Sequence, residues 1–188
     1  SDQLAAEAVR RVDPEAVNAV VGQVRRCLLL GQLRARSHDL QEQQLVGPAA
    51  GPAVWEKGGT GASELVSVLD TRDPHAEWRY DFRGGDTVSL SATFVTEFPI
   101  DRLYRLQLYL RNDDSWHALT AYVEKNGVRY RAERPYVLSD YTNWGLVTWQ
   151  EPGPDDFTNK IKSWIRLREV DRGPQYVSGP NQLRVVLE

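Results

Sequence analysis

The sequence predicts a mainly β protein, an antiparallel β-sandwich of the jelly-roll type that is preceded by a long N-terminal α-helix. From about residue 64 onward, apolar and polar residues alternate with a period of two in at least eight short segments, as in half-buried strands. No helical pattern separates these segments, which favours antiparallel pairing within two packed sheets. Before residue 47, by contrast, apolar residues recur at three- and four-residue spacing, which indicates a helix.

The predicted helix spans residues 14–45. Asp13 is a suitable N-cap, and Pro14 occupies the first helical position, where its missing N–H costs nothing. An apolar stripe follows, and its members are Val17, Val20, Val21, Val24, Cys27 and Leu28. A stripe of this kind predicts either a helix docked on the sandwich or a spacer that leads to another part of the protein.

Three parts are expected along the chain: an N-terminal helical segment at 1–47, a Gly/Pro-rich linker at 48–63 and a β-sandwich domain at 64–188. Within the sandwich domain, Asn126-Gly127 predicts a tight hairpin turn. The predicted strands lie near 78–82, 88–94, 106–110, 119–123, 128–132, 146–149, 161–167 and 183–187. The predicted core contains Trp78, Tyr80, Phe82, Leu106, Leu108, Leu110 and Ile165.

Composition restricts the classes of partner. With 23 basic and 26 acidic residues the chain has no overall positive field, so nucleic acid is not an expected partner. The single cysteine, Cys27, provides neither a disulfide framework nor a multi-cysteine zinc site. No apolar run reaches the roughly 18–20 residues that span a bilayer. Because Met is absent, we expect a processed chain or part of a longer protein, with membrane attachment only through a transmembrane segment elsewhere in that parent.

Catalytic, cofactor and metal motifs are absent from the sequence, which predicts a protein without enzymatic activity. The three histidines match no metal or nucleophile signature, and neither a nucleophile elbow nor a phosphate-binding loop is present. An alternative is a glycosidase-like carboxylate pair drawn from Asp113, Asp114, Glu124, Asp155 and Asp156. Asn112–Asp114 and Asp155–Asp156 also contain oxygen ligands for a structural calcium ion, although the same residues are common turn formers.

The strand period predicts one ligand-binding sheet face. If Leu106, Leu108 and Leu110 point inward, the residues between them point outward. The outward residues of this strand and of its expected hairpin neighbours are aromatic or polar, and they are Arg105, Gln107, Tyr109, Arg111, Trp116, Tyr122, Arg129 and Arg131. Aromatic rings pack on the C–H faces of sugars and the polar groups hydrogen-bond hydroxyls, so carbohydrate is one expected ligand.

A protein partner, or a purely structural role in which these aromatic residues are covered by packing, is the alternative. Tyr, Trp and Arg are also the residues enriched at the energetic centres of protein interfaces. A second predicted strand leaves Lys162, Trp164 and Arg166 on its outer side, and these three residues form the alternative interaction site.

Residues 78–186 resemble the galactose-binding-domain-like β-jelly-roll family, which includes many non-catalytic carbohydrate-binding modules. The resemblance is carried by Trp78–Phe82, by the segments 106–110 and 119–123, by Asn143–Trp149, and by the closing segments 160–165 and 183–187. It implies a jelly-roll fold and favours carbohydrate recognition without catalysis, although the family also includes domains that bind protein or lipid head groups. The N-terminal helix is foreign to the usual module. It suggests the extracytoplasmic part, periplasmic or at the cell surface, of a bacterial membrane protein such as a sugar transporter subunit or a sensor.

Overall fold

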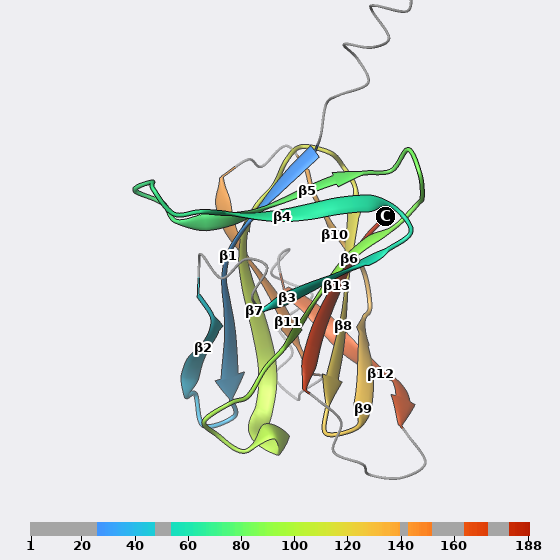
Figure 1. Ribbon diagram of the computed structural model, residues 1–188. Helices are drawn as coiled ribbons and strands as arrows, with labels where there is room; N and C mark the ends of the chain where they lie inside the picture. Colours follow the sequence, from blue (N-terminus) through green and yellow to red (C-terminus); the bar gives the residue numbers. More distant parts are fainter. Residues whose placement is uncertain (1–25, 48–53, 140–142, 152–163, 173–180) are drawn as a thin grey trace, which may run out of the picture.

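The computed structural model describes residues 26–47, 54–139, 143–151, 164–172 and 181–188. These residues form a barrel-like β-sandwich with thirteen strands and one 3-10 turn, η1 (Ile100–Arg102), and none of them lies in an α-helix (Figure 1). The strands are β1 (Arg26–Ser37), β2 (Glu42–Val46), β3 (Trp55–Gly59), β4 (Ala62–Val68), β5 (His75–Asp81), β6 (Val88–Thr93), β7 (Leu103–Arg111), β8 (Ala118–Lys125), β9 (Val128–Ala132), β10 (Tyr136–Val137), β11 (Trp144–Gln150), β12 (Trp164–Arg172) and β13 (Gln182–Leu187).

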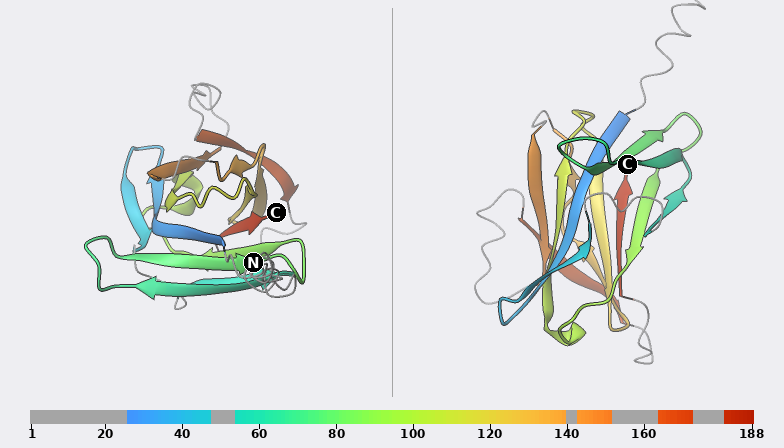
Figure 2. Two further views of the ribbon diagram at one scale, coloured as in Figure 1. Left: turned by 90° about the horizontal axis from the view of Figure 1, so that it is seen from above. Right: turned by 60° about the vertical axis from the view of Figure 1, so that its left-hand side comes forward.

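The strands follow one continuous hydrogen-bonded path in the order β3-β6-β13-β8-β9-β12-β11-β7-β1-β5-β4, with β10 beside β8 and β2 beside β1. Seen from above, the path curves around a central core, and the β4–β5 hairpin extends across one side (Figure 2). Every pairing among the described strands is antiparallel except that of β11 with β12. The described strands therefore form one continuous barrel-like wall rather than two separate sheets.

Strand β12 joins the two halves of this wall. Its first residues pair in parallel with β11, where Trp164 lies opposite Thr148. Its later residues pair antiparallel with β9, where Leu167 lies opposite Ala132. The same strand thus satisfies the backbone hydrogen-bonding groups of two neighbours that belong to different halves.

The two ends of the strand path are connected by the short link from β3 to β4. The Thr60 hydroxyl donates to the Asp86 carboxylate (2.9 Å) and accepts from the backbone N–H groups of Asp86 and Thr87. Gly85 passes so close to Thr60 that a Cβ on Gly85 would lie 2.3 Å from the Thr60 carbonyl carbon. The turn at Arg83–Asp86, in which the Gly85 N–H donates to the Phe82 carbonyl (3.3 Å), therefore holds this link in place.

The core confirms most of the predicted buried set. Trp78 and Trp149 are completely buried, and Tyr80, Leu106, Leu108, Leu110 and Ile165 are at most 2% exposed. Phe82 is the exception, because it packs on the edge of the core and is only partly buried. The predicted strands from residue 78 onward are confirmed as β5 to β9, β11, β12 and β13, although residues 161–163 lie outside the described part of the chain.

The predicted helix is wrong where the structure can test it, because residues 26–37 form β1 and residues 42–46 form β2. Of the apolar stripe that suggested the helix, only Cys27 and Leu28 lie in the described part, and there they are consecutive residues of a strand with only Leu28 fully buried. A register shift between Leu30 and Leu33 then breaks the alternation of inward residues, so Leu28, Leu30, Leu33 and Ala35 are buried without the regular period that identifies a strand. Residues 14–25 of the predicted helix lie outside the described residues.

Residues 26–47 are integral to the sheet. Strand β1 pairs with β5 along its first half, with β2 along its second half and with β7 on its other side. Part of the predicted linker is also strand, since Trp55–Gly59 forms β3 and the Trp55 side chain is buried. Residues 48–53 lie outside the described part. The described residues thus form one sheet system in which the predicted boundary at residue 47 has no counterpart.

The predicted hairpin at Asn126-Gly127 is confirmed, with φ values of 51° and 73° at these two residues. Just before the turn, the buried Lys125 donates from Nζ to the Leu103 carbonyl oxygen (2.7 Å) and forms an ion pair with Glu151. Because Lys125 is at the end of β8 whereas its partners border β7 and β11, this contact fixes the two halves of the barrel against each other.

Replacing Leu108 with Ala should lower the free energy of unfolding by about 2–5 kcal/mol, because a cavity is added to the lost transfer free energy of a fully buried side chain. Urea denaturation would measure the change. Leu146→Ala is the matched control on the neighbouring strand, and it should cost less than about 1 kcal/mol because Leu146 is on the outer side and exposed. Equal costs for the two variants would contradict the assigned strand faces.

Replacing Lys125 with Met should lower the free energy of unfolding by about 3 kcal/mol, because it leaves the Glu151 carboxylate and the Leu103 carbonyl without their buried donor. The same urea denaturation applies. Lys57→Met is the matched control, since the Lys57 ammonium also contacts a backbone carbonyl but does so at the exposed surface. A cost for Lys125→Met as small as the control's would show that the buried pair does not join the barrel halves.

Candidate ligand-binding surfaces

The residues of β7 that were predicted to face outward do so. Tyr109 and Arg111 are exposed, and Arg105 is half-buried. Gln107 points the same way but is only 7% exposed, and its amide donates to the Thr148 hydroxyl of β11 (3.2 Å). The outer side of β7 therefore combines an exposed tyrosine with a buried polar contact.

The eight predicted ligand residues do not form one patch. Strands β7 and β8 follow each other in the sequence, but β9, β12 and β11 lie between them in the sheet order. The chain between β7 and β8 crosses from one half of the barrel to the other instead of making a hairpin. Arg105, Gln107, Tyr109 and Arg111 are consequently on one part of the wall, and Tyr122, Arg129 and Arg131 are on another.

The first surface, called here the β7 face, consists of the outward residues of β1, β7, β11 and β12. It unites two predicted sites, because β11 places β12 close to β7: the Arg105 guanidinium lies 4.3 Å from the centre of the Trp164 ring. Arg166 follows on the same side of β12, with Nε 4.0 Å from the Glu133 carboxylate. Lys162, the third member of the alternative site, lies outside the described residues.

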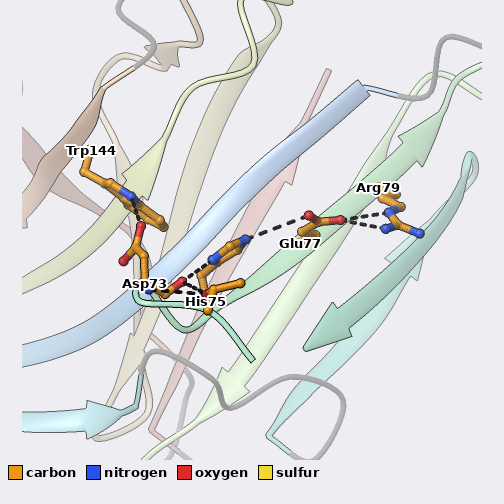
Figure 3. Close-up of polar contacts among 6 residues, drawn as sticks. Asp73, His75, Glu77, Arg79 and Trp144 are labelled. Atoms are coloured by element: carbon orange, nitrogen blue, oxygen red, sulfur yellow. Dashed lines mark hydrogen bonds and ion pairs between the residues drawn. The ribbon is translucent and has the colours of Figure 1, made fainter. Parts of the chain in front are cut away.

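Farther along this face, Tyr109 stacks on Trp144 with ring centres 5.1 Å apart. Gly31 on β1 makes room for the pair, since a Cβ at that position would approach the Tyr109 ring to 2.9 Å. Figure 3 shows how Trp144 is held, with its indole N–H donating to the Asp73 carboxylate (2.6 Å). His75 packs edge-on against the indole of Trp144. The sequence reasoning missed Trp144 as a surface residue, although its spacing from Leu146 indicates the same side of the strand.

The second surface is a groove of about 430 Å³ on the outer side of β8, β9, β12 and β13, called here the Tyr122 groove. It contains the predicted ligand residues Tyr122 and Arg129, and the Arg131 guanidinium lies 5.9 Å from the Tyr122 ring centre. The residues that complete its polar lining are Glu124, Asp171, Gln182 and Arg184. The sequence could have identified Arg184 as an outward residue, because it lies between the buried Leu183 and Val185. It contained no such indication for Asp171, which lies beyond the end of the predicted strand at 161–167.

Charges within the Tyr122 groove are balanced. Arg129 lies between two carboxylates, 3.5 Å from that of Glu124 and 3.8 Å from that of Asp171. The groove thus presents both hydrogen-bond donors and hydrogen-bond acceptors beside one aromatic ring. This combination suits a ligand rich in hydroxyl groups.

Trp116 belongs to neither surface as the structure defines them. It lies in the turn between β7 and β8, is 64% exposed and has a φ of 62°, which is unusual for a bulky residue. The turn is held by the Trp116 N–H, which donates to the Leu138 carbonyl (2.8 Å), and by Asp113, whose carboxylate accepts from the Tyr80 hydroxyl (2.5 Å). The structure therefore presents Trp116 to solvent on a well-anchored turn.

The described carboxylates considered for catalysis or calcium binding lie toward opposite ends of β8. Asp113 and Asp114 precede the strand, whereas Glu124 is near its far end, about 20 Å of strand beyond Ala118. A glycosidase pair needs a separation of roughly 5–10 Å. Asp155 and Asp156 lie outside the described residues. No group of three or more His, Cys, Asp or Glu side chains able to hold a metal ion occurs among the residues that the structure describes.

Cys27 is the only thiol of the chain, and it lies beside β5. Burial, together with the nearby Glu77 carboxylate, raises the pKa of Cys27 to about 11. A thiol with this pKa is almost entirely protonated at neutral pH, whereas nucleophilic cysteines need a lowered pKa. Its environment is that of a packing residue.

Comparison with known protein families, with curated proteins and with solved structures finds no match in any of the three. No described segment forms a helix of the length and hydrophobicity that crossing a membrane requires. The case for function consequently depends on the two surfaces themselves.

The raised pKa of Cys27 predicts slow alkylation. At pH 8 the folded protein should react with iodoacetamide roughly 100-fold more slowly than the urea-unfolded chain, whose thiol has an ordinary pKa of about 8.5. The native rate should keep rising as the pH approaches 11, because the thiolate fraction increases about tenfold per pH unit below the pKa. A native rate that levels off near pH 9 would contradict the assigned environment. Mass spectrometry of quenched samples measures both rates.

Proposed function

We propose that this protein is a non-catalytic binding domain that recognises carbohydrate in the Tyr122 groove. The observation that carries the proposal is an open groove of about 430 Å³ that has a tyrosine ring and a balanced set of charged and amide side chains in its lining. Ligand sites for small molecules commonly have volumes of this order. The groove includes two of the residues that the sequence reasoning selected for sugar binding, Tyr122 and Arg129.

The chemistry of the groove favours an uncharged sugar. Each sugar hydroxyl both donates and accepts hydrogen bonds, and the groove offers Arg129 and Arg184 as donors, Glu124 and Asp171 as acceptors, and Gln182 as both. The Tyr122 ring supplies an apolar surface for the C–H face of a sugar ring. Equal numbers of cationic and anionic side chains among these four charged residues give no preference for a charged ligand.

A protein partner is the second candidate, and Trp116 is the observation that favours it. A tryptophan 64% exposed on an anchored turn, in a backbone conformation that bulky residues rarely adopt, has the character of an interface anchor. Either candidate is compatible with the two wider expectations drawn from the sequence. We retain both as proposals: membership of the galactose-binding-domain-like jelly-roll family, and an extracytoplasmic position in a bacterial membrane protein.

If the groove binds sugar, a glycan array probed with this chain should give selective hits, and isothermal titration of the best hit should show weak to moderate affinity. Tyr122→Ala should lower that affinity by about tenfold or more, because it removes the stacking surface. Tyr109→Ala is the matched control, since Tyr109 is an exposed tyrosine on the other surface.

Two results would decide against this site, and a third would decide against a non-catalytic function. Loss of binding in Tyr109→Ala but not in Tyr122→Ala would move the sugar site to the β7 face. An array without hits, combined with a partner captured through Trp116 and lost in Trp116→Ala, would favour the protein-binding candidate. Reproducible glycan hydrolysis would contradict the absence of catalysis.

A further inference from the structure

Two arginines of the β7 face lie directly opposite each other on neighbouring strands. Arg36 of β1 is the cross-strand partner of Arg105 of β7, and both point to the outer side. Like charges in this position repel each other and destabilise a sheet. Burial lowers the pKa of Arg105 from its ordinary value, and the charge of Arg36 lowers it further.

Neither arginine is neutralised within the described part of the chain. Glu42 of β2 lies opposite Arg36, but its carboxylate pairs with Arg34 at 2.8 Å. The Nε atoms of Arg36 and Arg105 are both buried and lack a hydrogen-bond acceptor among the described residues. Other arginines of this face have their own carboxylates, Arg34 that of Glu42 and Arg166 that of Glu133. Among the described residues, no carboxylate thus pairs directly with Arg36 or Arg105, and Glu42 offsets only part of their charge.

Arg105 is also held in a fixed orientation. Its guanidinium contacts two aromatic rings, 5.0 Å from the centre of the Tyr104 ring and 4.3 Å from that of the Trp164 ring. Tyr104 itself stacks on His38, with ring centres 4.7 Å apart. The register shift after Arg36 makes this possible, because it leaves Tyr104 as an extra residue on β7. A guanidinium that is already packed against aromatic rings loses little side-chain conformational entropy when it binds an anion.

We infer that Arg36 and Arg105 bind the carboxylate of an acidic sugar residue, a uronate, whose ring lies beside Trp164. Guanidinium groups bind carboxylates with short, charge-assisted hydrogen bonds. The Oε1 atom of Gln150, which lies opposite Arg105 on β11, is buried without a donor and can accept from a sugar hydroxyl. Trp164 provides the aromatic surface for the ring. This site is separate from the Tyr122 groove and does not depend on the function proposed there.

The test compares tri-galacturonate with its fully methyl-esterified form, which has the same rings without the negative charges. Isothermal titration should detect binding of the acid and at least about tenfold weaker binding of the ester, as expected for loss of a charge-assisted contact. Arg105→Gln and Arg36→Gln should each weaken binding of the acid at least about tenfold. Arg83→Gln, which removes an exposed arginine that follows β5 and pairs with Asp81, is the control and should change it by less than about threefold.

A measurement without ligand separates this site from an ordinary structural contact. Arg36→Gln should raise Tm by about 1–3 °C, because it removes the repulsion across the strands, whereas Arg83→Gln, which only breaks an exposed ion pair with Asp81, should lower Tm or leave it unchanged. Near-UV circular dichroism would confirm that each variant is folded.

Four results would overturn the inference. They are equal affinity for the acid and the ester, no detectable binding of either, unchanged binding of the acid by Arg105→Gln, and a fall in Tm for Arg36→Gln that matches the control. Tyr122→Ala provides the distinction from the groove, since it should leave tri-galacturonate binding intact. If Tyr122→Ala abolished that binding while Arg105→Gln did not, the acidic sugar would belong to the Tyr122 groove, and the Arg36–Arg105 site would be rejected.

Discussion

The continuity of the barrel-like wall depends on β12, which hydrogen-bonds with two different partners along its length. Without it, β11 and β9 would be open edges, and an open edge exposes unpaired backbone groups to other chains. The change from parallel to antiparallel pairing within one strand also determines where the surfaces lie. Trp164 and Arg166 at its start belong to the β7 face, and Asp171 near its end lines the Tyr122 groove. Both candidate sites therefore depend on one strand.

The buried contacts of Lys125 with Glu151 and the Leu103 carbonyl hold the two halves of the wall together in the core. Burying an ammonium group is costly unless its partners are well placed, and those partners, Glu151 and the Leu103 carbonyl, come from the other half of the barrel. Any sliding of the β8–β9 hairpin against β7 and β11 would leave a buried charge unpaired. The contact therefore contributes more to the alignment of the halves than its net stabilisation implies. The alignment in turn keeps the strands of the Tyr122 groove side by side.

The sequence predicted strands well where each had a single buried face, as at Trp78, Tyr80 and Leu106–Leu110, because alternation alone then reports burial. It failed at β1, where the register shift before Leu33 broke the alternation, and this failure hid Arg36 as an outward residue. The regular order from Leu33 to Ser37, with Arg34 and Arg36 outward, was the remaining strand signal. Which strands become neighbours depends on contacts distant in sequence. Local patterns therefore did not reveal that Tyr109 and Tyr122 are on different surfaces.

The overall charge of −3 conceals a difference between the two surfaces that bears on their ligands. In the Tyr122 groove, Arg129 has carboxylates on both sides, so its hydrogen bonds are available to a neutral ligand without any gain from negative charge. On the β7 face, Arg36 and Arg105 repel each other, and an anion between them would remove a cost that the free protein bears. The stability of the folded state and the affinity for an anion are then linked. The repulsion between the two arginines lowers the stability of the free protein, and its relief by a bound anion raises the affinity for that anion. If both proposed sites bind sugars, the charge of the ligand expected at each surface thus follows from whether its arginines have counter-ions among the described residues.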